Sequence, residues 1–240
     1  MDFTYDSYEQ LLRLLSEHGY RFRTYDDYQP NERCVIMRHD VDNSLGQAEK
    51  LAEIEHDFGI RSTYFVLLSS DFYNPASNQS YKALHTIVDL GHKVGLHFDE
   101  TIYDYSTYDM RHYIEKEARI LSELTGIPIN CFSLHRPNTV TLETELTVPG
   151  YINSYSREFF RDFKYLSDSR RRWREPVEEI VKSEVYDRLH ILTHAFWYGD
   201  RERSLRESIG GFIQNAKFDR YSSMEKNITD LNSIIRRDEI

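Results

Sequence analysis

Carboxylate, imidazole and guanidinium side chains follow five of the predicted β-strands at the point where each strand ends. In a barrel of parallel strands, these carboxyl ends meet at one rim, where such barrels carry their chemistry. A lone histidine is more often a hydrogen-bonded structural residue than a ligand, but five exits together indicate a common site. The residues are His39, Asp40 and Asp42 after the first strand, His97, Asp99 and Glu100 after the third, His135 and Arg136 after the fourth, Asp168 after the sixth and His194 after the last.

The side chains at this rim match the needs of a hydrolytic metal site. Two imidazoles and a carboxylate around an open position hold a metal ion that polarises a carbonyl and lowers the pKa of a bound water to about 7. A second carboxylate can take the proton from that water, and a histidine can protonate the leaving group. His39 is expected to pack behind the barrel, because strand periodicity turns it away from Asp40.

The elements that carry these residues alternate between strand and helix patterns, which indicates parallel βα units. Seven strands suggest an open or distorted barrel rather than a closed eight-stranded one. Strands are predicted over 34–39, 62–68, 92–98, 129–135 and 189–194, with weaker ones near 150–155 and 164–168. Helices are predicted over 7–19, 45–58 with Ser44 as its cap, 79–90, from Ser106 to Gly126, briefly from Pro176, and through most of the chain from about 201.

Composition favours one α/β domain, and the negative charge argues against a nucleic-acid partner. The 240 residues contain no linker-like segment, and the formal net charge is −10. The run Arg170–Arg171–Arg172 is too short to reverse that argument. We interpret it as a solvated turn or as a local clamp for an anionic group. The sequence makes no prediction of the oligomeric state.

The first residues, MDFTYDSYEQLLRLL, lack the basic and apolar segments of a signal peptide. No run approaches the roughly 18 apolar residues of a transmembrane segment. We therefore expect a cytoplasmic protein. In that compartment Cys34 and Cys131, both in apolar strand-like runs, are expected to be reduced core thiols.

Residues from about 34 to 197 resemble the polysaccharide deacetylase superfamily, which is also described as the NodB-homology or carbohydrate esterase family 4 group. The resemblance is carried by RHDVD, GHKVGLHFDE, SLHRPN and LTH, in that order. It implies a distorted (β/α)7 barrel in a single domain over 1–240, with helical additions at both ends, the second over about 201–238. The variant motifs resemble a divergent branch that acts in surface-polysaccharide (O-antigen or capsule) biosynthesis.

The resemblance also implies roles for individual residues. RHDVD implies Asp40 as the catalytic base and Asp42 as a metal ligand, GHKVGLH implies His97 as a ligand, and LTH implies His194 as the general acid. The Arg-Pro motif implies that Arg136 holds the carboxylate of the base.

Four further residues have expected roles around this site. Asp168 and Trp173 approximate the family's Asp-Trp motif, and Asp168 is expected to orient a catalytic histidine. Trp197, Trp173 and Asp99 are the candidate substrate-binding residues.

The chain departs from the family pattern four residues after His97, where relatives have a second histidine and this chain has Thr101. We expect His135, at the adjacent strand exit, to complete the ligand set, with Asp99 or Glu100 as the alternatives. The expected cofactor is a divalent metal ion, zinc first, with nickel, cobalt or manganese as alternatives.

The resemblance implies a hydrolase that removes an N-acyl group, N-acetyl first, from a small-molecule or oligosaccharide sugar precursor. Two alternatives remain. Thr101 favours a catalytically silent carbohydrate-binding or scaffold protein on the same barrel, and the site would also suit a hydrolase of another C–N bond, such as a formamide or cyclic amide. Retention of metal separates the two hydrolases from the silent protein.

Overall fold

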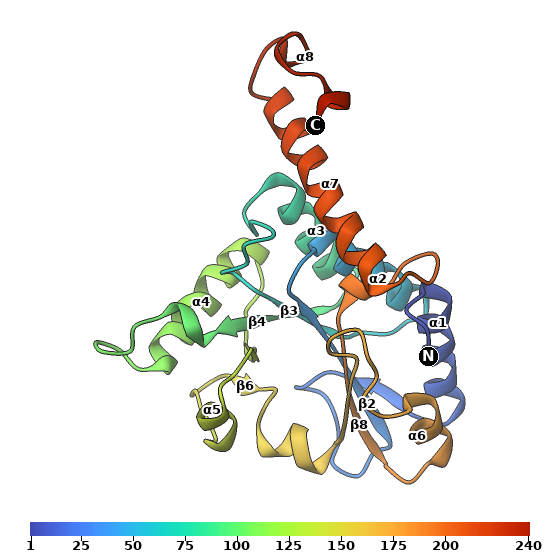
Figure 1. Cartoon of the computed structure of the whole chain (residues 1–240). Helices are drawn as coiled ribbons and strands as arrows, with labels where there is room; N and C mark the ends of the chain where they lie inside the picture. The colour runs from blue at the N-terminus through green and yellow to red at the C-terminus, as the bar shows by residue number, and fades with distance from the viewer. The chain divides into compact units, whose positions relative to one another are not determined.

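The computed structural model describes residues 1–240, which divide into two compact units, residues 1–200 and 201–240. The first unit is built on a curled sheet whose strands all pair in parallel, in the order β6-β5-β4-β3-β2-β8-β7, with β1 paired to β2 off this path. Helices surround the sheet (Figure 1). The sheet stays open, because β6 and β7 end the path. The predicted distorted (β/α)7 barrel is confirmed as this half-barrel.

The bounds of the elements follow the predicted alternation. The strands are β1 (Arg21–Arg23), β2 (Cys34–Val41), β3 (Thr63–Val66), β4 (Lys93–Asp99), β5 (Cys131–His135), β6 (Ile152–Asn153), β7 (Lys164–Ser167) and β8 (Arg188–Thr193). The α-helices of the first unit are α1 (Tyr5–Glu17), α2 (Leu45–Asp57), α3 (Asn78–Asp89), α4 (Met110–Thr125), α5 (Thr139–Glu143) and α6 (Val177–Ser183). Short 3₁₀ turns follow β4 (Glu100–Ile102) and β8 (Ala195–Trp197).

Local capping explains where most of these helices begin. The Ser44 side chain accepts a hydrogen bond from the Gln47 amide, as predicted for the start of α2. The predicted start of α4 at Ser106 is wrong, because Asp109 caps that helix. Ser106 instead donates its amide and hydroxyl to the Asp104 side chain in a turn.

Alternation along β2 separates the two faces of the sheet. Val35, Met37 and Val41 join the large core beneath the helices, whereas Cys34 and Ile36 belong to a second apolar cluster on the opposite face. Both cysteines are free and buried, in line with the expectation of core thiols. On the same face as Cys34 and Ile36, the next alternate residues towards the rim are polar: Arg38, Asp40 and Asp42. The sheet interior therefore changes from apolar to ionic towards the carboxyl ends of its strands.

Close packing inside the curled sheet requires a glycine at position 95 of β4. A Cβ atom on Gly95 would lie 2.5 Å from Cε1 of Phe65 and 2.9 Å from Sγ of Cys131. Only glycine fits this approach of β4 to its neighbours. Because Gly95 lies two residues before His97 on the same face of β4, this packing fixes the position of the His97 side chain at the rim.

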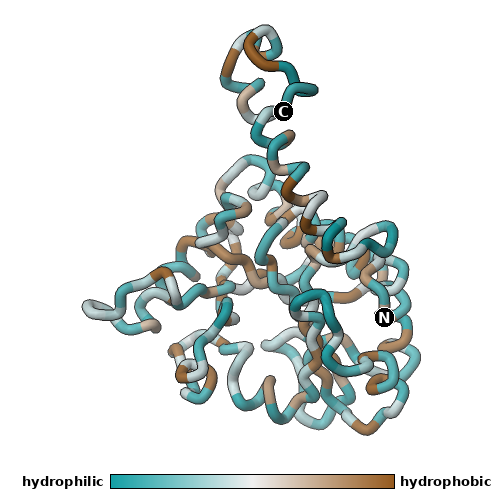
Figure 2. Tube along the Cα trace, viewed as in Figure 1, coloured by the Kyte–Doolittle hydropathy of each residue, from teal (hydrophilic) through white to brown (hydrophobic).

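The second unit is helical, as predicted for the chain from about 201. It consists of α7 (Leu205–Glu225), α8 (Leu231–Ile234) and a closing 3₁₀ turn (Arg237–Glu239), and the Tyr221 hydroxyl donates to the Ile235 carbonyl. Ser204 and Glu207 form a complete capping box at the start of α7. None of the helices is both long and apolar enough to cross a membrane, and Figure 2 shows hydrophilic residues interspersed along the chain.

Candidate metal centre and acid–base site

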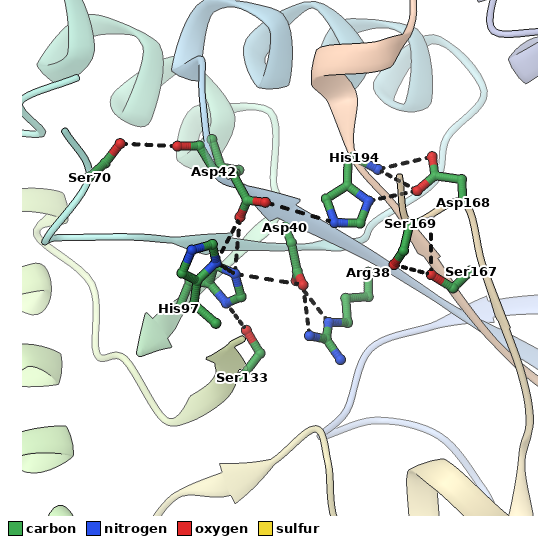
Figure 3. A network of polar contacts seen from close by, with 12 residues as sticks. Arg38, Asp40, Asp42, Ser70, His97, Ser133, Ser167, Asp168, Ser169 and His194 are labelled. Carbon is green, nitrogen blue, oxygen red and sulfur yellow. Dashed lines mark hydrogen bonds and ion pairs between the residues drawn. The ribbon is translucent and has the colours of Figure 1, made fainter. Parts of the chain in front are cut away.

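Three side chains from the carboxyl ends of β2, β4 and β5 converge at the rim. Oδ1 of Asp42, just beyond β2, lies 3.1 Å from Nε2 of His97 on β4 and 3.4 Å from Nδ1 of His135 on β5. The two imidazole nitrogens are 3.2 Å apart, and all three ligand atoms lie within 4.8 Å of one another. Figure 3 shows Asp42 and His97 facing each other. The predicted ligand set of Asp42, His97 and His135 is thus brought together.

The donors in this trio suit a divalent metal ion. Oδ1 of Asp42 is buried and has no hydrogen-bond partner in acceptable geometry, although two imidazole nitrogens face it. Burial would raise the pKa of Asp42, but His135 and His97 hold it well below its usual range, so the carboxylate is ionised. Nδ1 of His97 lies 2.6 Å from the Ser133 hydroxyl, which orients the ring.

Asp40 lies beside the trio and is held by a buried arginine from its own strand. The Arg38 guanidinium donates two hydrogen bonds of 2.8 Å, one to each Asp40 oxygen, and both side chains are buried. Burial would raise the pKa of Asp40, but the charge of Arg38, together with His97, lowers it. Oδ2 of Asp40 lies 3.8 Å from Nε2 of His97 (Figure 3).

A histidine–aspartate pair faces the trio from the other side. Nδ1 of His194 lies 2.7 Å from Oδ1 of Asp168, and the His194 amide donates to the same carboxylate, so the ring is fixed. Nε2 of His194 points to Oδ2 of Asp42 at 4.0 Å (Figure 3). Burial would lower the pKa of His194, but Asp168, with Asp42 and Asp40, raises it to about 9. The imidazole is therefore protonated at neutral pH.

Hydrogen bonds from the loop after β3 hold the carboxyl end of β2 in place. The Tyr73 hydroxyl donates to the Val41 carbonyl while accepting from the Leu67 amide, and the Ser70 hydroxyl donates to the Asp42 carbonyl. These contacts fix the backbone that carries Asp40 and Asp42.

The back of β2 carries a buried polar network that sequence reasoning did not predict. His39 points away from the site, as expected, and its ring nitrogens lie 2.7 Å from Thr193 Oγ1 and 2.9 Å from Glu55 Oε1. Glu55 also accepts from the hydroxyls of Tyr8 and Tyr64. The network links β2 to β8 directly behind Asp40 and His194.

Other predicted residues lie outside this constellation. Arg136 is exposed, and Arg38 makes the contact with Asp40 that the Arg-Pro motif assigned to Arg136. Asp99 caps the following turn and binds the Thr101 amide and hydroxyl. Glu100, the other alternative ligand, accepts hydrogen bonds from Asn138.

The two tryptophans are partly buried and pack against the large core. The indole nitrogens of Trp173 and Trp197 are buried without a hydrogen-bond partner. Their substrate-binding role stays a prediction. A surface hollow of about 640 Å³ lies elsewhere, at the amino ends of β7 and β8 beside Lys164, Tyr186 and Arg188, so it is not part of this site.

Comparisons with known proteins return structural matches only. No protein-family model and no curated protein matches the sequence. Among the solved structures, a carbohydrate esterase family 4 pseudoenzyme from Bacillus anthracis is 17% identical with a TM-score of 0.45, over 80% of this chain and 63% of that one. A peptidoglycan deacetylase from Bacillus subtilis is 13% identical with a TM-score of 0.47, over 88% and 99%.

A chitin deacetylase from the fungus Colletotrichum lindemuthianum is 12% identical with a TM-score of 0.44, over 82% of this chain and 86% of that one. This chain spans slightly less than two thirds of the first matched structures, at 63–65% of their length.

Proposed function

We propose that this chain is a metal-dependent hydrolase that removes an N-acyl group, N-acetyl first, from a sugar precursor. One arrangement carries the proposal: a carboxylate–imidazole trio lies between an ionised aspartate on one side and a protonated histidine on the other. Amide hydrolysis needs these three functions within reach of one carbonyl carbon.

A divalent ion held by Asp42, His97 and His135, zinc or alternatively nickel, cobalt or manganese, would supply a Lewis acid for the amide carbonyl and for a water molecule. Asp40 accepts the proton of the attacking water. Its ionised state, maintained by Arg38 despite burial, supports this role. Arg38 acts as a positioning residue, because both of its hydrogen bonds go to the base.

His194 donates a proton to the departing amine in the second half of the reaction. Two features support this role: its pKa is raised to about 9, and Asp168 fixes the ring with Nε2 directed towards the trio. The amine nitrogen must be protonated before the C–N bond breaks, because an amide anion is a poor leaving group.

Acetate release from N-acetylated sugars by the metal-loaded protein tests the proposal. We expect acetate from at least one member of a panel that includes N-acetylglucosamine oligomers and nucleotide-linked sugars. Asp40→Asn should keep the metal and the fold but lose most turnover, since an amide cannot take the proton of the water. Normal turnover in that variant would remove Asp40 from the role of base.

The same assay addresses the two alternatives. A formamide-bearing sugar or a cyclic amide that is cleaved while all acetamides are inert would favour the hydrolase of another C–N bond. A protein that stays free of metal under metal-replete conditions, binds sugar and cleaves none of these substrates would favour the silent carbohydrate-binding protein. The argument for the silent protein is that Thr101 replaces the second histidine ligand of the family pattern. The position of His135 beside Asp42 and His97 weakens this argument, because His135 supplies an imidazole in its place.

A further inference from the structure

Arginines with a left-handed backbone lie on both sides of the candidate site. The described chain has five non-glycine residues at positive φ, and three of them are Arg136 (φ 53°), Arg170 (φ 62°) and Arg171 (φ 56°). Arg136 directly follows His135 of the trio, and Arg170 is the second residue after Asp168. Both segments lie in loops at the carboxyl ends of the strands.

This backbone conformation is unfavourable for arginine. Two consecutive residues at positive φ define a turn in which glycine, asparagine and aspartate predominate, yet Arg170 and Arg171 occupy these positions. Arg136 precedes Pro137, and a residue in that position is normally extended. Such conformations persist where the surrounding structure imposes them, and they cluster at ligand-binding sites.

The turn after β7 is held by backbone hydrogen bonds, which leave the guanidinium groups of Arg170, Arg172 and Arg174 available. The Arg172 amide donates to the Asp168 carbonyl and the Arg174 amide to the Ser167 carbonyl, which ties the turn to the residue that orients His194. Arg136, Arg170, Arg172 and Arg174 are exposed, and none of them forms an ion pair. All four follow the carboxyl end of β5 or β7, next to His135 or Asp168 of the candidate site, in a chain with a net charge of −10.

We infer that Arg136 and the turn containing Arg170 and Arg172 bind a phosphate ester carried by the substrate. This inference rests on the proposed function and specifies its substrate class: an N-acylated sugar linked to a phosphate or diphosphate. Guanidinium groups bind phosphate oxygens through paired, charge-assisted hydrogen bonds. Because Arg38 and not Arg136 donates to Asp40, the Arg136 guanidinium is available to bind a phosphate.

Glycine substitutions test the inference without threatening the fold. In Arg170→Gly and Arg136→Gly the guanidinium is removed and the left-handed backbone is relieved, so the melting temperature should stay the same or rise. Calorimetric titration of the metal-loaded full chain would compare N-acetylglucosamine 1-phosphate with neutral N-acetylglucosamine. We expect the phosphate ester to bind more tightly, and each variant to lose about tenfold of its affinity while the neutral sugar is unaffected.

Arg119→Gln provides the matched control, because Arg119 is also exposed and without an ion pair but lies on α4. It should reduce the affinity for the phosphate ester only slightly, through the change in net charge. UDP-N-acetylglucosamine and farnesyl-diphosphoryl N-acetylglucosamine distinguish a nucleotide-linked from a lipid-linked substrate. Whichever binds more tightly, the gain should disappear in Arg170→Gly.

Three results would overturn the inference: equal affinities for the neutral and phosphorylated sugars, a phosphate preference that survives both glycine variants, or equally tight binding of the carboxylated sugar N-acetylmuramic acid. Acetate release from neutral N-acetylglucosamine oligomers separates this inference from the proposed function. Release without any phosphate preference refutes the inference alone. An arginine-dependent phosphate preference without release from any substrate supports the binding site and refutes the proposed hydrolase.

Discussion

At the scale of single residues, the buried pair of Arg38 and Asp40 is the feature on which the site depends most. Arg38→Met keeps much of the side-chain volume but leaves the Asp40 carboxylate buried without its partner. Removing one partner of a buried ion pair costs about 3–5 kcal/mol. We therefore expect that loss in the free energy of unfolding, measured by urea denaturation, together with a raised pKa of Asp40.

Arg136→Met is the control for this prediction. Arg136 is exposed and forms no ion pair, so the variant should change the free energy of unfolding by no more than about 0.5 kcal/mol. Equal losses in the two variants would return the role of holding Asp40 to Arg136. The sequence motif could not distinguish the two arginines, because Arg-Pro specifies a neighbour along the chain and not which guanidinium reaches the carboxylate.

The ligand set gives a second prediction at this scale. His135→Ala should remove metal from the purified protein, because Asp42 and His97 alone leave an incomplete ligand shell. Thr101→His, which restores the family pattern, should leave metal content unchanged, because the Thr101 hydroxyl binds Asp99 and not a member of the trio. Elemental analysis of metal per chain measures both. Metal retained at full occupancy in His135→Ala would exclude His135 as a ligand.

At the scale of elements, the packing of β4 sets the position of His97. Gly95→Ala places a Cβ atom against Phe65 and Cys131, both of which are buried and cannot move freely. Overpacking of this kind costs about 1–3 kcal/mol, and the displaced strand should also weaken metal retention. Gly46→Ala on α2 is the control, because nothing lies within 4 Å of its Cβ position and alanine favours the helix. If both variants unfold at the same denaturant concentration, the close approach at Gly95 does not matter.

Helix α4 contains a buried carboxyl that makes stability depend on pH. Burial raises the pKa of Glu117 from 4.5 to about 7. Between these values the folded protein holds the proton that the unfolded chain has lost, so the free energy of unfolding falls as the pH rises from about 4.5 to about 7. The total fall from this group is at most about 3 kcal/mol. It is complete above pH 7.

Glu117→Gln tests this account of α4. The amide oxygen can still accept the Tyr103 hydroxyl, while the titration disappears. We expect the variant to be more stable than the parent at pH 8 and equally stable near pH 4, by denaturation at both values. A stability difference that does not change with pH would contradict the raised pKa.

Hydrophobic periodicity predicted most elements, because β2, β4, β5 and β8 carry long apolar runs with clear stops. Two of the features that this pattern missed show why. The three-residue β1 has no run of its own and forms by pairing with β2. The start of α4 moved from Ser106 to Asp109, since both residues can cap a helix and only the turn at Asp104 decides between them. Non-local contacts of this kind are not encoded in a local pattern.

At the scale of the whole molecule, the two apolar clusters and the candidate site all lie within residues 1–200. Both apolar clusters consist of residues from this unit, and so do the trio, the Arg38–Asp40 pair and the His194–Asp168 pair. Composition shows no linker near residue 200, and the single domain over 1–240 stays a prediction. The predicted start of the helical segment, about 201, coincides with the boundary between the two units.

The division leads to a prediction about truncation. A chain ending at Asp200 should fold, bind metal with the same stoichiometry and unfold in one cooperative transition, because it keeps every buried member of the two clusters. Circular dichroism should lose helical signal in proportion to α7 and α8, while the melting temperature of the remaining protein stays within a few degrees of that of the full chain. Ending the chain instead at Ser183 is the control, because it removes β8 and with it the strand that pairs β2 to β7. That shorter chain should not fold. A chain ending at Asp200 that is equally unfolded would show that residues 201–240 are required for the stability of the barrel.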